Sequence, residues 1–497
     1  MTPSDSTATP SSRHRPRGVA LALAMGLWCL AGGPVSAQSH IELPEIGDSA
    51  GTVISQEQER KIGEQFMRQV RRYAPLISDP ELNEYIQGLG ESITEHVDYH
   101  GDFTFFLLDL DEINAFAVPG GFIGFHSGLI LNSHDENEVA SVMAHEIVHV
   151  TQRHSIRGFE AQKNMTIPGI VGMLGAIMLA AVNPEAGQAA IAGVQALQAQ
   201  NQLNFTRSNE QEADRIGIQL LAEAGYEPDA MARFFERLKL ANRYNDPKYI
   251  PEYLRTHPVT NNRIAEAKDR AARLPSNVRE SSLAYHHAWA KLKARSFDQP
   301  LAAVDYFETV IENETYRHPD AARYGYAISL ARAGRFDRAE ALVADLIERF
   351  PEQIYYRLAA ADIARDEGDF ASARRHYEDA MLIDDSHRGA VYGLADLLTK
   401  TGEAKLAREV LRDFSFRRDP DLDYYRLLAY AEGESGDVVA ARVTISEYYF
   451  RAGELRLARE QLRIAQRQTG VESYQRLRIE ARLAEIDKAL AELEERS

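Results

Sequence analysis

The sequence has little cysteine, little tryptophan and no excess of basic residues. Its 497 residues include one cysteine and two tryptophans, so a framework of disulfide bonds is excluded. The 74 acidic side chains outnumber the 56 basic ones, and the formal net charge is -18. This balance offers no general source of the phosphate neutralisation on which nucleic-acid binding depends, so we expect no nucleic-acid partner. A hydrophobic content of 44% is typical of a globular protein and not of a polytopic membrane chain.

The first 37 residues have the layout of a secretory signal peptide. Three arginines between positions 13 and 17 precede an apolar run over 18–30, and small residues at 35–37 form a cleavage site. The single cysteine, Cys29, lies in the apolar run, without the small residue before it that lipoprotein cleavage requires. We therefore expect an exported protein with no disulfide, no lipid anchor and no stable transmembrane anchor. An uncleaved membrane anchor is the alternative, but the run is shorter than the ~20 residues that span a bilayer.

The pattern of residues 38–275 predicts a domain in which helices surround a small sheet. Ser55 and Gln58 form a capping box at the start of one helix, and Asp79-Pro80 starts another. The period then changes, because Phe103 to Leu108 reads as a buried strand. Residues 114–118 and 122–125 read as two strands joined through Pro-Gly-Gly, which predicts a hairpin. The fold class of this part is therefore α+β.

The stretch 164–206 is almost without charge, since Glu185 is its only charged residue. We interpret it as a partly apolar flap over a cleft. A membrane-inserted hairpin is the alternative, although Asn183-Pro184 interrupts its first half, and glutamines, among them Gln188, Gln195, Gln198 and Gln202, make its second half too polar for lipid. Peripheral contact of 164–206 with a membrane stays open.

An internal repeat fills the C-terminal part, which we assign to residues 283–497. Glycines recur every 34 residues, each with an alanine five positions later, at Gly334, Gly368, Gly402 and Gly436. Small residues at fixed places in such a period are what stacked helix hairpins require. The pattern resembles the tetratricopeptide repeat, although the signature tryptophan is absent. Pro351 agrees with the family's terminal proline, but Asp385 and Asp419 take that position in the later repeats of this chain. We predict an all-α solenoid with a degenerate first repeat and an atypical last one.

A metal-binding pattern lies in a helical stretch of the first part. His145 and His149 are four residues apart, so both imidazoles point from one face of the helix and can share a metal ion. Glu146 is offset by one residue and lies beside that face. Its carboxylate can reach a water on the metal without binding the metal itself.

A second helix supplies the predicted third ligand. Glu210 and Asp214 are four residues apart on one face of that helix. Two histidines and Glu210 leave one tetrahedral position open for water, which is typical of a catalytic zinc site with one Zn²⁺ per chain. Asp214 would then accept a hydrogen bond from a ligand histidine, for which we favour His145. Glu212 is the alternative third ligand, but it lies ~200° around the helix from Glu210.

These motifs resemble those of the gluzincin metalloproteases. More narrowly, the segment 114–121, the motif from His145 to His149, the segment 209–214 and the segment from His257 to Arg263 look like the CAAX prenyl protease and HtpX-type family. The resemblance implies a zincin-like fold and zinc-dependent cleavage of peptide bonds. With the leader and the repeats, it also implies a periplasmic enzyme of envelope protein quality control.

Two downstream residues are candidates for the remaining chemistry. The oxyanion of the transition state needs a donor or a positive charge, and His257 and Arg263 are the candidates. His257 could instead be a fourth zinc ligand that keeps the enzyme latent, and the sequence leaves this choice open. We interpret three other histidines as ordinary packing or surface residues without partners, namely His126, His134 and His154.

Substrates and partners are expected to be proteins. Ala115, Phe116 and Ala117 would form an edge strand to which an extended, unfolded segment can add, with main-chain hydrogen bonds and little sequence choice. The concave repeat surface would dock partners. By resemblance, the substrates are misfolded or stalled outer-membrane proteins and the partners belong to the outer-membrane barrel assembly machinery. The alternative function is a chaperone or scaffold with a latent or structural metal site.

Overall fold

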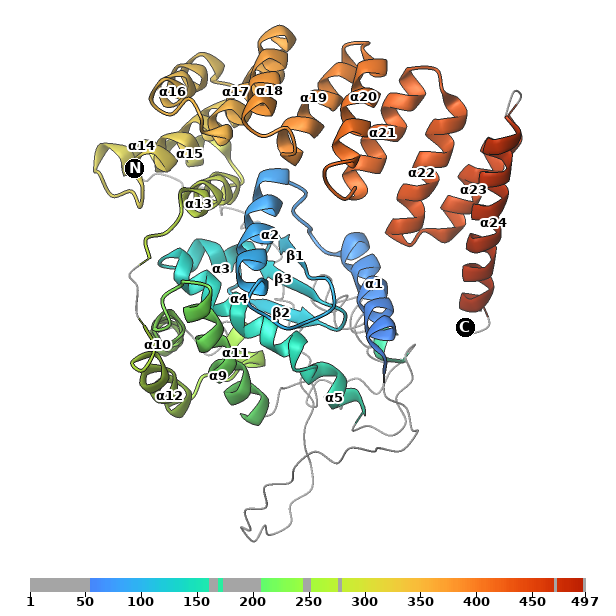
Figure 1. Cartoon of the computed structure of the whole chain (residues 1–497). Helices are drawn as coiled ribbons and strands as arrows, with labels where there is room; N and C mark the ends of the chain where they lie inside the picture. The colour runs from blue at the N-terminus through green and yellow to red at the C-terminus, as the bar shows by residue number, and fades with distance from the viewer. Residues whose placement is uncertain are drawn as a thin grey trace, which may run out of the picture.

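The structure is a computed structural model in which residues 54–160, 169–172, 207–244, 252–275, 279–468 and 472–494 are described (Figure 1). The predicted leader 1–37, with Cys29, lies outside these ranges, as does the predicted flap 164–206 apart from residues 169–172. Among the described helices, none combines the length and the apolar character that crossing a bilayer requires.

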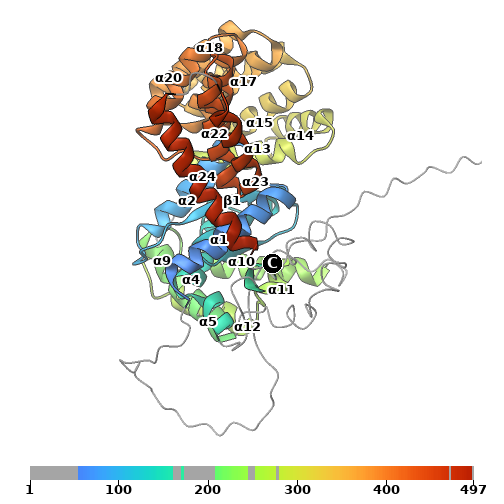
Figure 2. The same cartoon turned by 90° about the vertical axis from the view of Figure 1, so that its right-hand side faces the viewer.

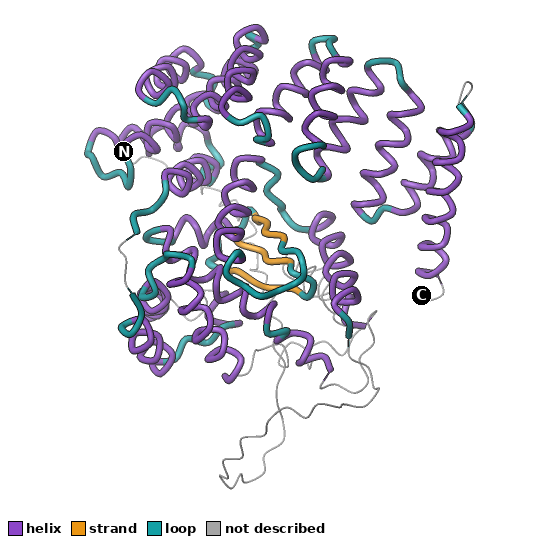
Figure 3. The backbone as a smooth tube through the Cα atoms, viewed as in Figure 1, coloured by secondary structure: helices purple, strands orange, loops and turns teal. Residues whose placement is uncertain are grey.

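The N-terminal part, residues 54–275, surrounds a small sheet with helices (Figure 3). Its helices are α1 Gln56–Tyr73, α2 Pro80–Thr94, α3 Ser127–Asn132, α4 Glu136–Thr151, α5 His154–Glu160, α9 Arg207–Glu223, α10 Ala230–Tyr244, α11 Glu252–Thr256 and α12 Asn261–Ala271. Its strands are β1 Thr104–Leu108, β2 Ala115–Val118 and β3 Phe122–His126. The predicted α+β fold class is confirmed.

The first two helices begin at the predicted residues. The Ser55 hydroxyl accepts a hydrogen bond from the Gln58 amide at 3.3 Å, and the Gln58 side chain accepts one from the Ser55 amide at 2.8 Å. At the start of α2, the Asp79 carboxylate accepts hydrogen bonds from two backbone amides, each at 3.1 Å. These contacts satisfy amides that have no partner within the helix, so the caps determine where each helix starts.

The sheet has the strand order β1-β3-β2, so β2 is an edge strand. Strand β3 pairs parallel with β1 and antiparallel with β2, which confirms the predicted hairpin. Gly120 and Gly121 turn the hairpin with φ angles of 86° and 84°. A side chain at Gly121 would also place its Cβ 2.1 Å from the Asp102 carbonyl oxygen, so only glycine fits there.

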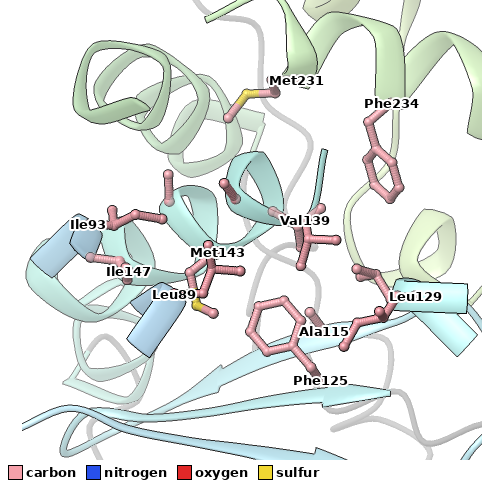
Figure 4. Close-up of a cluster of buried hydrophobic side chains, with 14 of the residues drawn as sticks. Leu89, Ile93, Ala115, Phe125, Leu129, Val139, Met143, Ile147, Met231 and Phe234 are labelled. Atoms are coloured by element: carbon pink, nitrogen blue, oxygen red, sulfur yellow. The ribbon is translucent and has the colours of Figure 1, made fainter. Parts of the chain in front are cut away.

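Helix α4 is the centre of the hydrophobic core (Figure 4). Every residue from Glu136 to Val150 is buried. The side chains around it come from α2, the sheet, α3 and α10, and they include Leu89, Ile93, Ala115, Phe125, Leu129, Met231 and Phe234. Because α4 is enclosed on all sides, any group that it carries is held in a fixed position with little access to water.

The repeat part forms a curved row of helix pairs above the N-terminal part (Figures 1 and 2). Its helices are α13 Leu283–Arg295, α14 Pro300–Glu312, α15 Pro319–Arg332, α16 Phe336–Arg349, α17 Ile354–Glu367, α18 Phe370–Ile383, α19 Arg388–Lys400, α20 Ala404–Ser415, α21 Leu422–Glu434, α22 Val438–Ala452, α23 Leu455–Gln466 and α24 Ser473–Glu494. The four periodic glycines all have positive φ, between 70° and 99°, at the turn inside each pair. The predicted solenoid is confirmed.

Helix α2 lies on the inner side of this row and makes polar contacts with it. Lys291 of α13 donates to Glu81 at 2.6 Å and lies 2.9 Å from Asp79. Glu84 pairs with Arg418 at 2.7 Å and with Arg388 at 3.2 Å. The N-terminal part therefore occupies some of the surface that we expected to be open to partners.

The first repeat helix, α13, belongs to the core of the N-terminal part. Tyr285, Ala288 and Leu292 lie in the same buried cluster as the side chains of α4. Glu136, in the first turn of α4, accepts hydrogen bonds from the Ser282 amide at 2.8 Å and from the Ser282 hydroxyl at 2.7 Å. The two parts therefore share apolar packing and buried hydrogen bonds at their junction.

Two glycines of α2 allow a matched test of how this helix packs on the sheet. A Cβ at Gly90 would lie 2.1 Å from the ring of Phe105, whereas a Cβ at Gly88 would meet nothing within 4 Å. We expect Gly90→Ala to lower the free energy of unfolding by about 1–3 kcal/mol through overpacking. Gly88→Ala should raise it by about 0.4–1 kcal/mol by restricting the unfolded chain. Urea unfolding followed by circular dichroism measures both, and equal midpoints for the two variants would contradict this packing.

Candidate active site

Helix α4 carries the two histidines of the predicted motif. Its N-terminus is capped by Asp135, which accepts a hydrogen bond from the Glu138 amide at 3.0 Å. His145 and His149 point from the same face, and their Nε2 atoms are 3.0 Å apart. Each is 1% exposed, so burial holds both imidazoles in place.

Helix α9 packs against α4 and brings two carboxylates to these histidines. Gly217 permits the close approach, because a Cβ there would already be 3.4 Å from the His145 amide nitrogen. The two oxygens of Glu210 lie 3.5 Å from His145 Nε2 and 3.5 Å from His149 Nε2. Asp214 lies one turn further along, with its Oδ1 3.1 Å from His145 Nδ1. The geometry thus brings together the four residues that we predicted to act at the metal.

His257 enters the cluster from the segment after α11. Its amide donates to the Tyr253 carbonyl at 2.7 Å, and its ring stacks on the Tyr253 ring with centroids 4.7 Å apart. Its Nδ1 lies 3.1 Å from both oxygens of Glu210 and 3.3 Å from His145 Nε2. The second nitrogen, Nε2, lies 3.5 Å from Glu146 Oε1. His257 therefore lies between the predicted ligands His145 and Glu210 and the predicted base Glu146.

Four donor atoms, one each from His145, His149, Glu210 and His257, all lie within 4.8 Å of one another. Tetrahedral zinc, with bonds of about 2.0–2.1 Å, requires donor atoms that are roughly 3.4 Å apart. With Oε2 of Glu210 as its donor atom, the distances given above fall between 3.0 and 3.5 Å for four of the six pairs. Nitrogen and carboxylate oxygen are also the donors that zinc accepts, so these side chains fit a single zinc ion.

The electrostatics of the cluster favour a cation. Burial by itself lowers the pKa of His145, but hydrogen bonds to Asp214 and Glu210 outweigh burial and raise this pKa to about 9. Burial also acts against the charged form of Glu210, yet His257 and Arg263 hold the pKa of its carboxyl well below the usual range. The carboxylates therefore stay ionised and stabilise positive charge at the histidine nitrogens, which is the charge that a divalent ion supplies.

Arg263, in the first turn of α12, contacts the two carboxylates of α9. Its Nε and one terminal nitrogen form a bidentate pair with Asp214 at 2.7 and 2.8 Å, and its other terminal nitrogen lies 2.8 Å from Glu210. That nitrogen also donates to the Pro258 carbonyl at 2.9 Å. These contacts orient Glu210 and Asp214. The predicted contact of Arg263 with a substrate oxyanion stays a prediction.

Glu146 lies on the side of α4 that faces the sheet edge. It is fully buried, and burial raises the pKa of its carboxyl above the usual range. The backbone of Ala117 in β2 acts in the opposite direction and lowers this pKa, although neither carboxylate oxygen has a hydrogen-bond partner among the described residues. Strand β2, which contains Ala115, Phe116 and Ala117, therefore runs next to the predicted base, and its three residues are at most 3% exposed.

The expectation that His154 has no partner is wrong. Its Nδ1 lies 2.8 Å from Nδ1 of His149, and its Nε2 lies 3.0 Å from Glu212 Oε2. Arg157 donates to the same Glu212 oxygen at 3.0 Å. Glu212, the alternative third ligand, therefore lies behind His149 and is not among the four clustered donors.

A tight turn after α4 creates this contact. Arg153 has a φ of 52°, a left-handed conformation that is rare outside glycine, and it is held there by Glu59 at 2.5 Å. The turn folds α5 back so that His154, its first residue, meets His149. A helical wheel cannot predict this contact, because the helix has ended. In the sequence, the only indication of this contact is that His154 follows His149 by five residues.

The other two histidines stay apart from the cluster. His126, at the end of β3, is fully buried and packs edge-on against Phe116 with centroids 6.3 Å apart. The side chain of His134 is 81% exposed and lies 3.5 Å from Asp135. These positions agree with the packing and surface interpretations.

The chain matches two known families. Residues 80–271 match Peptidase family M48, and residues 294–363 and 364–429 match the tetratricopeptide repeat. The M48 match contains all of the clustered donors, together with Glu146, Asp214 and Arg263.

Two of the relatives match this chain over nearly its whole length, and a third matches a smaller part of it. The beta-barrel assembly-enhancing protease of Escherichia coli K12 is 36% identical over 458 residues, which are 91% of this chain and 93% of the relative. The protein of that name from Yersinia pestis is 33% identical over 91% of this chain and 95% of its own length. The mitochondrial metalloendopeptidase OMA1 of Bos taurus is 29% identical over 40% of this chain and 36% of its own. The protein therefore belongs to the beta-barrel assembly-enhancing protease family and is a metalloendopeptidase.

Proposed function

We propose that this protein is a zinc metalloendopeptidase of envelope protein quality control. It would be exported to the periplasm through the leader 1–37 and would consist of a peptidase domain, 38–275, and a repeat domain, 283–497. Its substrates would be misfolded or stalled outer-membrane proteins, and its partners would include the outer-membrane barrel assembly machinery. The observation that carries the zinc assignment is the set of donor distances of 3.0–3.5 Å among buried histidines and Glu210. The names of the relatives support the cellular role.

His145, His149 and Glu210 would hold the zinc ion. Zinc bound there supplies Lewis acidity, which activates water and polarises a peptide carbonyl. Asp214 would accept a hydrogen bond from Nδ1–H of His145, which fixes the tautomer that leaves Nε2 free to bind. Arg263 would keep Glu210 and Asp214 ionised and in place.

Glu146 would act as the general base and then as the general acid. Its carboxylate takes a proton from the attacking water, and the carboxylic acid that results gives this proton to the leaving amine. The raised pKa of the buried carboxyl brings it closer to neutral pH, where a group can both accept and release a proton. The extended substrate would pair with Ala115, Phe116 and Ala117 of β2, beside this carboxylate.

His257 supports a latent state of this enzyme. Its Nδ1 lies at 3.1–3.3 Å from the donor atoms of Glu210 and His145, where a fourth ligand would stand. In that position it would take the place of the reacting water. If the imidazole of His257 turned away from the fourth position around the metal, a water could take that position. His257 or Arg263 would then donate a hydrogen bond to the oxyanion of the transition state. The same position of His257 favours the second candidate function, a chaperone or scaffold with a latent metal site.

His154 and Glu212 would be positioning residues. With the proton of His154 on Nε2, that nitrogen donates to Glu212, and the bare Nδ1 accepts the Nδ1 proton of His149. This arrangement leaves His149 Nε2 free for the metal. The pair of His154 and Glu212, which we call the relay, thus fixes the tautomer of His149, as Asp214 fixes the tautomer of His145.

Partner docking would use the part of the repeat surface that α2 leaves free. Two cavities of about 370 and about 520 Å³ lie between the start of α2 and the inner repeat helices. Both contain Lys291, Asp362 and Arg365, and both are lined by charged side chains of either sign. A partner segment would therefore meet a polar surface, next to contacts that join the two domains.

We expect Glu146→Gln to abolish cleavage of an unfolded protein while the zinc content stays about one per chain, because an amide cannot accept the proton. Proteolysis assays and metal analysis test this pair of outcomes. The same variant, crosslinked in its native envelope, should retain uncleaved substrates and docking partners. Undiminished cleavage would overturn the assignment of the base, and recovery of cytosolic proteins alone would contradict export.

We expect His257→Ala to raise the basal rate of cleavage, because the variant frees the fourth position around the metal. His134→Ala, in which an exposed histidine is removed, is the matched control and should leave the rate unchanged. Initial rates on an unfolded protein substrate provide the measurement. Loss of activity in His257→Ala would instead favour the oxyanion role. No activity in either the wild type or His257→Ala, with partner binding retained, would favour the scaffold function.

We expect His154→Ala and Glu212→Gln to lower the affinity for zinc about 10-fold to 100-fold, the usual effect of losing a hydrogen-bond partner of a ligand histidine. Chelator competition measures the affinity, and the absorption spectrum of the cobalt(II) form reports the ligand geometry. Glu223→Gln removes an exposed carboxylate from the same helix and serves as control. Unchanged affinity and an unchanged cobalt spectrum in both relay variants would contradict the positioning role.

A further inference from the structure

A large cleft lies between the N-terminal part and the end of the repeat row. It has a volume of about 680 Å³ and is lined by α1, by Phe122 at the start of β3 and by residues of α22, α23 and α24. Figures 1 and 2 show α24 descending beside α1. The cleft is separate from the clustered histidines, none of which lines it.

The cleft carries an excess of positive charge in an acidic protein. Six basic side chains line it, against two acidic ones, and they are Arg60, Lys61, Arg68, Arg71, Arg451 and Arg482. The two acidic side chains pair with three of these six cations, because Glu64 pairs with Arg60, and Glu447 pairs with both Arg451 and Arg482. Burial lowers the pKa of Arg68 and of Arg71, and the charge of Arg68 lowers the pKa of Arg71 further. A bound anion would relieve this repulsion.

Several of these guanidinium groups are already held in place. Arg482 lies over the Phe450 ring at 3.8 Å, and Arg60 lies over the Phe122 ring at 4.5 Å. The stem of Arg68 packs directly on Gly453, where a Cβ would be 1.4 Å from the Arg68 Cδ atom. Side chains that are ordered before binding lose less entropy when they bind, and a guanidinium fork matches the geometry of a carboxylate.

We propose that this cleft binds an acidic segment of a polypeptide, with its carboxylates on the guanidinium groups of Arg68 and Arg71. Apolar side chains of the segment would contact Met67, Phe450 and Leu455, which line the same cleft. This mixture of cations and apolar surface fits a polypeptide better than a bare phosphate. The proposal rests on the metalloendopeptidase activity in one respect, which is that an enzyme of this kind binds polypeptides. The bound segment would touch both parts of the protein at once.

A fluorescent peptide of alternating glutamate and leucine tests the proposal, with a lysine and leucine peptide as its counterpart. Binding is measured on the full-length Glu146→Gln protein, so that cleavage does not interfere. We expect the acidic peptide to bind, the basic one not to bind, and a rise from about 0.05 to about 0.3 M salt to weaken binding. Arg68→Glu combined with Arg71→Glu should weaken it by roughly tenfold or more.

The matched control is Arg335→Glu combined with Arg375→Glu, which changes the net charge equally at exposed positions of the outer repeat surface. Arg71→Gln alone removes one charge and keeps a polar side chain in its place, which gives a second variant with a milder change. Equal loss in the cleft and control variants, or no loss in either, would overturn the proposal. Binding of phosphatidylglycerol vesicles at this cleft, with no binding of the acidic peptide, would overturn it in favour of a lipid. A loss confined to the cleft variants supports it, even if Glu146→Gln still cleaves protein.

Discussion

The compensation of two buried carboxylates is the constraint on which the site depends. Glu210 and Asp214 are 2% and 5% exposed, and uncompensated charges at such depth would cost several kcal/mol each. Arg263 reaches both of them, and it does so from a helix that lies 49 residues beyond Asp214. The segment between these residues must therefore close over the site before the carboxylates can be buried. The cluster can form only when α4, α9 and α12 have all packed together.

The sequence predicts those features that depend on spacing within one element. His145 and His149 on one face, Glu210 above Asp214, the capping box at Ser55 and the glycines of the repeats all follow from helical geometry, and the structure has each of these arrangements. Contacts that depend on how the chain reverses direction between two helices could not be predicted from helical spacing. His154 meets His149 only because Arg153 adopts a left-handed conformation after the helix ends.

The packing between the N-terminal part and the repeat part could not be predicted from the sequence either. Repeat periodicity indicates an inner surface but not what lies against it. In the structure the start of α2 lies there, and Lys291, Arg388 and Arg418 of the repeat part pair with its carboxylates. Each of these ion pairs joins residues more than 200 positions apart, so no local pattern could reveal it. These ion pairs therefore join the repeats to a helix that itself packs on strand β1 of the sheet.

The shared core at α13 has a consequence for biosynthesis. Tyr285, Ala288 and Leu292 belong to the same buried cluster as the side chains of α4, yet they follow the last residue of the M48 match, Ala271. A chain that emerges from its N-terminus cannot finish this core until the first repeat helix has also emerged. Until then, apolar side chains around α4 are left without cover. The order of synthesis thus delays completion of the core that contains α4 until the chain has begun to make the repeat part.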